Sequence, residues 1–194
     1  MHIAAAVFAI ASMLTPIPKD RENRLFLSTD AGTKLIFKPD GHEGQIVTYE
    51  VLKATHKNGV AKVIIKHADK EPKELEINAC ADGLYIIDNP QESDAKHYIL
   101  KCPFKNGDSW NSTRSLKDTE HGITYDVQCS YRVAFVGEIE VPAGRFSTVC
   151  IECTFRVLDS VLKKQSIWYA PDVGPVKIVE DGKTSVLTKI AKNK

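Results

Sequence analysis

The apolar and polar residues of this chain alternate with a period of two in its second half. In residues 125–135, Tyr, Val, Cys, Tyr, Val and Phe at the odd positions alternate with Asp, Gln, Ser, Arg and Ala. Residues 149–157 repeat the pattern with Val, Ile, Cys, Phe and Val. Successive side chains of a strand point to opposite faces, so both segments are predicted to be strands. The Val-Pro-Ala-Gly turn at 141–144 is expected to join them as a hairpin.

Five Asn-Gly or Asp-Gly pairs mark tight turns along the chain, at positions 40–41, 58–59, 82–83, 106–107 and 181–182. Such pairs favour two-residue hairpin loops, because both residue types tolerate the positive φ that these loops require. Short segments rich in β-branched and aromatic residues lie between the turns and predict further strands. These segments are 34–38, 45–54, 60–67, 74–79, 84–87, 97–101, 166–169, 176–179 and 185–190.

The length of the chain and the lack of a helical pattern bound the fold. A chain of 194 residues can bury one sizeable hydrophobic core, so we expect a single domain over residues 19–194. No segment repeats its apolar residues with a helical period, which excludes doubly wound α/β folds and their phosphate-binding loops. The sequence therefore predicts an all-β fold, with a single antiparallel, strongly twisted sheet curled into a half-barrel or an open sandwich.

Residues 1–18 have the pattern of a signal peptide. Residues 3–14 are apolar except for Ser12, and Ala-Ile-Ala at 9–11 matches a signal-peptidase site. Pro16 and Pro18 end the apolar run before a polar segment begins. We therefore expect an exported protein, periplasmic or extracellular, and a soluble one because no lipobox cysteine follows the run. A short buried helix or strand is the alternative for these residues.

Composition and charge narrow the expected partners. The chain carries 26 Lys and Arg against 25 Asp and Glu, a formal net charge of +1. It therefore has no overall basic field to attract nucleic acid or an anionic membrane, and nucleic acid is not an expected partner. No stretch reaches the roughly 20 apolar residues of a membrane-spanning helix, so no transmembrane span is predicted.

The five cysteines are the first candidates for chemistry. Cys150 and Cys153 form a C-x-x-C, but residues three apart in a strand point to opposite faces with Cα atoms about 10 Å apart. A disulfide allows at most about 7 Å, and one zinc ion would need both thiolates on the same side. Cys129 and Cys153 instead fall on the apolar faces of two strands predicted to pair. A disulfide or two packed thiols is expected at that place.

No catalytic residue, metal site or cofactor is predicted. Gly107-Asp108-Ser109 resembles the nucleophile block of some esterases, but it follows a turn in a β-rich region and lacks the structural context of that motif. The histidines lack the spacing of a helical metal site, and the carboxylates show no isolated pair in an apolar segment. An enzyme with a site assembled from loops therefore stands only as an alternative.

Three segments resemble a family of bacterial exported antiparallel β-sheet proteins of unknown function. Residues 103–110 are similar to its Pro-hydrophobic-x-x-Gly-x-x-Trp opening, and 141–146 to its Val-Pro-Ala-Gly-x-Phe turn. Residues 168–177 are similar to its Tyr-Ala-Pro-x-Val-Gly-x-Val-Lys segment, with Pro175 where the family usually has a large apolar residue. The resemblance covers residues 98–180 and implies a curved antiparallel sheet in the cell envelope. It implies no catalytic residue.

Three functions are compatible with these features. The first is an exported cell-envelope protein, not an enzyme, that binds a lipid or another apolar or amphipathic small molecule on a concave sheet face. Trp110, Trp168 and Tyr169 are the candidate ligand-binding residues, and filling of the core is the alternative role for them. The second is a protein-interaction or assembly module with a filled core. The third is the enzyme with a loop-assembled site.

Overall fold

The computed structural model describes residues 25–39, 46–68, 73–87, 96–118, 122–158 and 160–192. All regular secondary structure in these residues is strand, and twelve strands form one antiparallel sheet, which confirms the predicted all-β class. The strands are β1 Lys34–Pro39, β2 Val47–Lys57, β3 Val60–Ala68, β4 Lys73–Cys80, β5 Gly83–Ile86, β6 His97–Lys101, β7 Ser109–Asp118, β8 Ile123–Val141, β9 Gly144–Val157, β10 Ser160–Ala170, β11 Gly174–Glu180 and β12 Lys183–Ala191.

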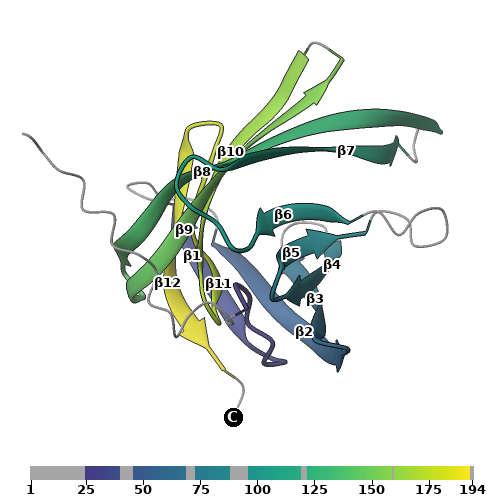
Figure 1. Ribbon diagram of the computed structural model, residues 1–194. Coiled ribbons are helices and arrows are strands. Elements are labelled where there is room, and N and C mark those ends of the chain that lie inside the picture. The colour runs from purple at the N-terminus through teal and green to yellow at the C-terminus, as the bar shows by residue number, and fades with distance from the viewer. Residues whose placement is uncertain are drawn as a thin grey trace, which may run out of the picture.

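The sheet curls until it is nearly closed into a barrel with one seam. The strand order is β6-β5-β4-β3-β2-β1-β12-β11-β10-β9-β8-β7, so the first and last strands pair in the middle of the sheet. β6 and β7 are the two edges, and they run side by side across the seam without a hydrogen-bonded ladder (Figure 1). The chain is therefore two consecutive meanders, β1–β6 and β7–β12, joined through β1 and β12.

The predicted hairpin turns are confirmed at 58–59, 141–144 and 181–182. At 82–83 the turn is displaced by one residue, because Cys80 pairs with Gly83, and the pair at 106–107 lies in the connection between β6 and β7, which do not pair. β8 and β9 pair from Val141 and Gly144 at the turn to Gln128 and Arg156. At 58–59 and at 181–182 both residues of the turn have positive φ, as a two-residue hairpin loop requires. The turn predicted at 40–41 and the signal peptide predicted over residues 1–18 lie outside the described residues.

β7 is a ten-residue strand that the hydrophobic pattern did not predict. It pairs with β8 along its whole length, from Ser109 opposite Arg132 to Asp118 opposite Ile123. Its sequence is SWNSTRSLKD, in which polar residues occupy both faces. The alternation of apolar and polar residues with a period of two is therefore absent from this strand, because its core side carries the polar Ser112 as well as Trp110.

Two hydrophobic clusters fill the core side of the sheet. The larger contains Val63, Leu84, Leu100, Val133 and Val149, all at most 1% exposed, and so joins both meanders. The smaller surrounds Leu187, where the tip of the β8–β9 hairpin packs against β12. There the backbone N–H of Ala143 donates to the Leu187 carbonyl at 3.1 Å.

One end of the barrel is covered by the segment before β1. Phe26 belongs to the larger cluster, and its ring meets that of Phe104 edge to face at 5.5 Å. The backbone N–H of Ser28 donates to the Val173 carbonyl, and the N–H of Gly32 donates to the Val51 carbonyl. These contacts attach the segment to both meanders at the end of the barrel where β1 begins.

Candidate functional site

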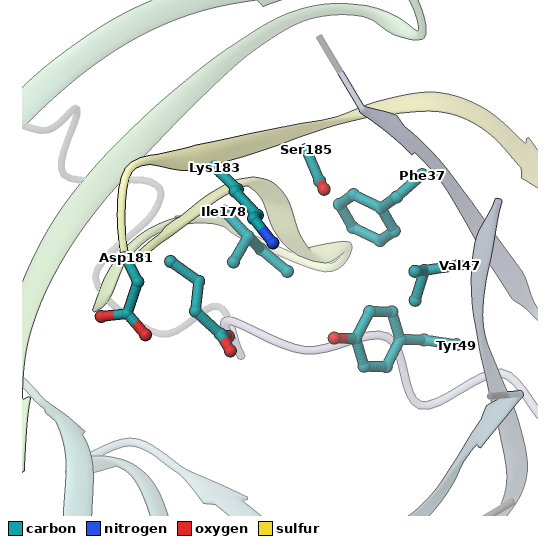
Figure 2. Close-up of a pocket in the computed structure, with 8 residues that line it drawn as sticks. Phe37, Val47, Tyr49, Ile178, Asp181, Lys183 and Ser185 are labelled. Carbon is teal, nitrogen blue, oxygen red and sulfur yellow. The ribbon is translucent and has the colours of Figure 1, made fainter. Parts of the chain in front are cut away.

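A cavity of about 340 Å³ opens at the opposite end of the barrel, on the core side of β1, β2, β11 and β12. Figure 2 shows the side chains that surround it. Its lining divides into an apolar part and a polar part. The apolar residues are Phe37, Val47, Tyr49 and Ile178, and the polar residues are Glu180, Asp181, Lys183 and Ser185.

Strand register brings the lining residues to one side of the sheet. Phe37 of β1 lies opposite Val47 of β2, and Ser185 of β12 lies opposite Ile178 of β11. Tyr49 packs against both hydrophobic clusters, and its ring meets that of Phe37 edge to face at 5.4 Å. Phe37 is only 1% exposed, so the apolar wall is fixed by core packing rather than by a flexible loop.

The polar end of the cavity is built around the β11–β12 turn. Glu180 makes an ion pair with Lys163 at 2.8 Å and accepts a hydrogen bond from the Gln165 amide at 3.2 Å. Asp181 accepts a hydrogen bond from the backbone N–H of Lys164 at 3.0 Å. Both carboxylates are thereby partnered by β10. An apolar wall with ionic groups at one end suits an amphipathic molecule better than a purely apolar one.

The three aromatic residues singled out in the sequence lie in three different places, and none of them lines the cavity. Tyr169 is 7% exposed in the larger cluster, and burial raises the pKa of its hydroxyl above the ordinary value. Trp168, the preceding residue in β10, packs against the smaller cluster instead, and the Lys177 amine lies 4.7 Å from its ring centroid. The structure therefore does not bring Trp168 and Tyr169 into one site.

Trp110 lies at the seam. Its indole N–H donates to the Tyr98 carbonyl of β6 at 2.8 Å, and its ring stacks on Tyr131 of β8 with centroids 5.3 Å apart. The Lys101 amine lies 5.9 Å from the centroid of the same ring. Trp110, a residue of the edge strand β7, thus links β6 to β7 and β8 across the seam, where the two edges of the described sheet share no ladder.

The five cysteines are all free thiols. Cys129 and Cys153 are buried on the core side of β8 and β9 beside Tyr131, whose partner across the strands is Cys153. Burial and, to a lesser extent, the neighbouring Cys129 raise the pKa of Cys153 to about 12, although the hydrogen bond with Tyr131 acts to lower it. Burial likewise raises the pKa values of Cys102 and Cys150 to about 12. These thiols are therefore neutral, weak nucleophiles near pH 7.

This burial predicts slow alkylation. At pH 8 a thiol with a pKa of about 12 is ionised in roughly 1 molecule in 10,000, so we expect iodoacetamide to modify Cys150 and Cys153 at least about tenfold more slowly than the half-buried Cys80. Peptide mass spectrometry of timed samples measures the rates, and urea-unfolded protein is the control, in which all three should react alike. Equal rates in the native protein would contradict the prediction.

Other kinds of site find no support in the part of the chain that the structure describes. There, no three His, Cys, Asp or Glu side chains come together as a metal-binding group. Within the same residues there is also no helix long and apolar enough to cross a membrane. The cavity could not be predicted from the sequence, because its lining comes from strands near the two ends of the described chain.

The fold and the cavity define a class, a single-sheet, nearly closed β-barrel with an amphipathic cavity at one end. No protein-family model matches the chain, and a search of curated proteins found no match. Two solved structures share the fold. One is a Bacteroides fragilis protein, inferred to be exported, with a YmcC-like fold. It is 14% identical in sequence with a TM-score of 0.54, and the match covers 87% of this chain and 100% of the Bacteroides chain. The other is an inferred lipoprotein from Parabacteroides distasonis, with 14% identity, a TM-score of 0.58, and coverage of 87% and 99%.

Proposed function

We propose that this protein is an exported, non-enzymatic binding protein of the cell envelope that holds an amphipathic small molecule in the cavity. The observation that carries the proposal is the division of the lining into two parts. One is an apolar wall and the other is an ionic end, and the residues are Phe37, Val47, Tyr49 and Ile178 for the wall and Glu180, Asp181 and Lys183 for the end. The apolar part of a ligand would lie against Phe37 and Tyr49, and its polar group would lie near Lys183.

The titratable groups of the core support binding rather than catalysis. The groups with the largest raised pKa values are thiols and phenols whose burial keeps them neutral, and none of them lines the cavity. Catalytic sites usually bring perturbed groups together in the pocket itself. The sequence pattern of residues 1–18 and the two structural neighbours, one inferred to be exported and one inferred to be a lipoprotein, support an envelope location.

A substitution that fills the cavity tests the proposal. Ser185→Phe places a ring on the cavity side of β12, whereas the neighbouring Thr184→Phe places the same ring on the opposite face. With 11-(dansylamino)undecanoic acid as a fluorescent probe, we expect the first variant to weaken binding by about tenfold or more and the second to leave it within about twofold. Circular dichroism checks that both variants fold.

Two results would contradict the proposal. The wild-type protein would fail to bind this probe or any other amphiphile of comparable size, or both variants would bind as the wild type does. The second result would place the bound probe away from the cavity.

A further inference from the structure

The β9–β10 hairpin ends in an exposed apolar surface that the cavity does not use. Leu158, Val161 and Leu162 are 85%, 46% and 56% exposed. We call these three residues the apolar tip. Figure 1 shows the hairpin projecting beyond the neighbouring strands. The other exposed large apolar residues that the structure describes, Ile46, Leu52, Leu75, Tyr125 and Phe135, are well separated along the chain, whereas three fall within five residues at this hairpin.

Two local irregularities present these side chains. Leu158 has a φ of 53°, a left-handed conformation that a leucine rarely adopts. The pairing of β9 with β10 shifts register between Val161 and Lys163, which leaves Leu162 as the extra residue of a bulge. A two-residue hairpin loop requires a positive φ, but Asn, Asp or Gly ordinarily occupies that position, so both the leucine at 158 and the bulge at Leu162 place apolar side chains at irregular backbone positions. Such features commonly mark functional positions.

Charge around the apolar tip identifies the kind of surface it fits. Residues 156–164 contain three basic residues and one acidic residue. The Lys163 amine is held by Glu180, whereas Arg156 and Lys164 make no ion pair with any other residue that the structure describes. Leucines flanked by basic residues suit a phospholipid bilayer, where apolar side chains enter below the headgroups and cations meet lipid phosphates.

The position of the tip relates it to the cavity. In an antiparallel meander alternate turns lie at the same end, so the β9–β10 and β11–β12 hairpins share one end of the barrel. The ion pair of Lys163 with Glu180 and the hydrogen bond from Lys164 to Asp181 join the two hairpins directly. The apolar tip therefore extends from the strand that borders the ionic end of the cavity.

We propose that the apolar tip inserts into the headgroup region of a phospholipid bilayer and so places the cavity end of the barrel against the membrane. The net charge of +1 gives no long-range attraction, so the contact depends on the leucines, with Arg156 and Lys164 favouring anionic lipid. A second copy of the chain is a poorer occupant, because three side chains fall far short of the ~800 Å² per partner of a standard interface. Such a contact would let a ligand pass between the bilayer and the cavity, and this role rests on the proposed function. The membrane contact itself does not rest on it.

Vesicle flotation of the protein purified from its own cell envelope tests the inference. Vesicles are either phosphatidylcholine alone or phosphatidylcholine with phosphatidylglycerol. We expect the wild type to float with both, more with the anionic vesicles at low salt. Leu158→Asn with Leu162→Asn should lower the bound fraction by about tenfold or more. The matched control is Leu52→Asn with Leu75→Asn, which removes two exposed leucines from β2 and β4 and should leave binding unchanged.

Separate readouts distinguish this inference from the proposed function. Ser185→Phe should lose the dansyl probe and still float with vesicles, whereas the tip variant should bind the probe and no longer float. The inference is overturned if the wild type does not float, or if the tip variant floats as well as the wild type. It is also overturned if the tip mutations abolish self-association in sedimentation velocity without changing flotation.

Discussion

Replacing Gly83 by alanine should lower the free energy of unfolding by on the order of 4 kcal/mol, at the upper end of single-residue effects. Gly83 begins β5 with a φ of +127°, and a Cβ atom there would lie 1.9 Å from the Leu100 carbonyl oxygen of β6. The two strands cannot move apart easily at this point, because the side chains of Leu84 in β5 and Leu100 in β6 are 1% and 0% exposed and are packed in the core. The methyl group would therefore force β6 away from β5.

Gly59→Ala is the matched control for that result. Gly59 also has a positive φ, +75°, but a Cβ atom there would meet nothing within 4 Å. Its substitution should cost about 1 kcal/mol from backbone strain alone. Urea unfolding followed by circular dichroism measures both values. Equal losses in the two variants would mean that the contact with β6 contributes nothing.

Trp110→Ala should cost about 3 kcal/mol, because it removes both the stacking on Tyr131 and the hydrogen bond to the Tyr98 carbonyl. Trp110→Phe keeps a ring over Tyr131 and should cost about 1 kcal/mol for the lost hydrogen bond. The seam has no ladder to compensate, so backbone amides of β6 should exchange faster in both variants, with little change in β1 and β12.

Hydrogen exchange separates this local effect from general destabilisation. If Trp110→Ala raised exchange equally in β1, β6 and β12, the tryptophan would be an ordinary core residue rather than a link across the seam. Unchanged exchange in β6 would show that other contacts hold the two edges together.

The strands with one apolar and one polar face could be predicted from sequence, and β8 and β9 are the clearest cases. The odd residues 127–133 of β8 and 149–153 of β9 are buried in the core, so the period-two pattern reflects burial there. Tyr125 and Phe135, predicted to share that apolar face, are 37% and 39% exposed, and for Phe135 the reason is the bulge between Val133 and Phe135, which shifts the alternation. β7 was missed for the opposite reason. It is an edge strand whose core-side positions include the polar Ser112, so the polarity of its residues does not indicate which face of the strand is buried.

Closure of the sheet could not be predicted, because it depends on pairing between the two ends of the described chain. Phe37 and Leu187 face each other across β1 and β12, and nothing local to either strand specifies that partner. The cavity depends on the same pairing, since Phe37 and Ser185 line it from these two strands. Inward-facing residues look alike in a sequence whether they fill a core or border a space.

The candidate residues chosen from the sequence were aromatic, and the structure places them apart from one another and from the lining of the cavity. Trp168 and Tyr169 are adjacent in β10 but pack against different clusters, Tyr169 within the larger and Trp168 against the smaller. The ionic residues of the cavity lie at an Asp-Gly turn, with Asp181 inside it and Glu180 and Lys183 on either side, where charged residues are ordinarily explained by exposure to solvent. Only the curvature of the sheet turns them towards an apolar wall.

The most direct test of the account is native mass spectrometry of the protein purified from its own cell envelope, compared with the denatured protein. The account predicts a native species heavier than the denatured chain by the mass of an amphipathic molecule. This adduct should be absent from Ser185→Phe and retained in Thr184→Phe. A native mass equal to the denatured mass, or an adduct kept equally by both variants, would contradict binding in the cavity.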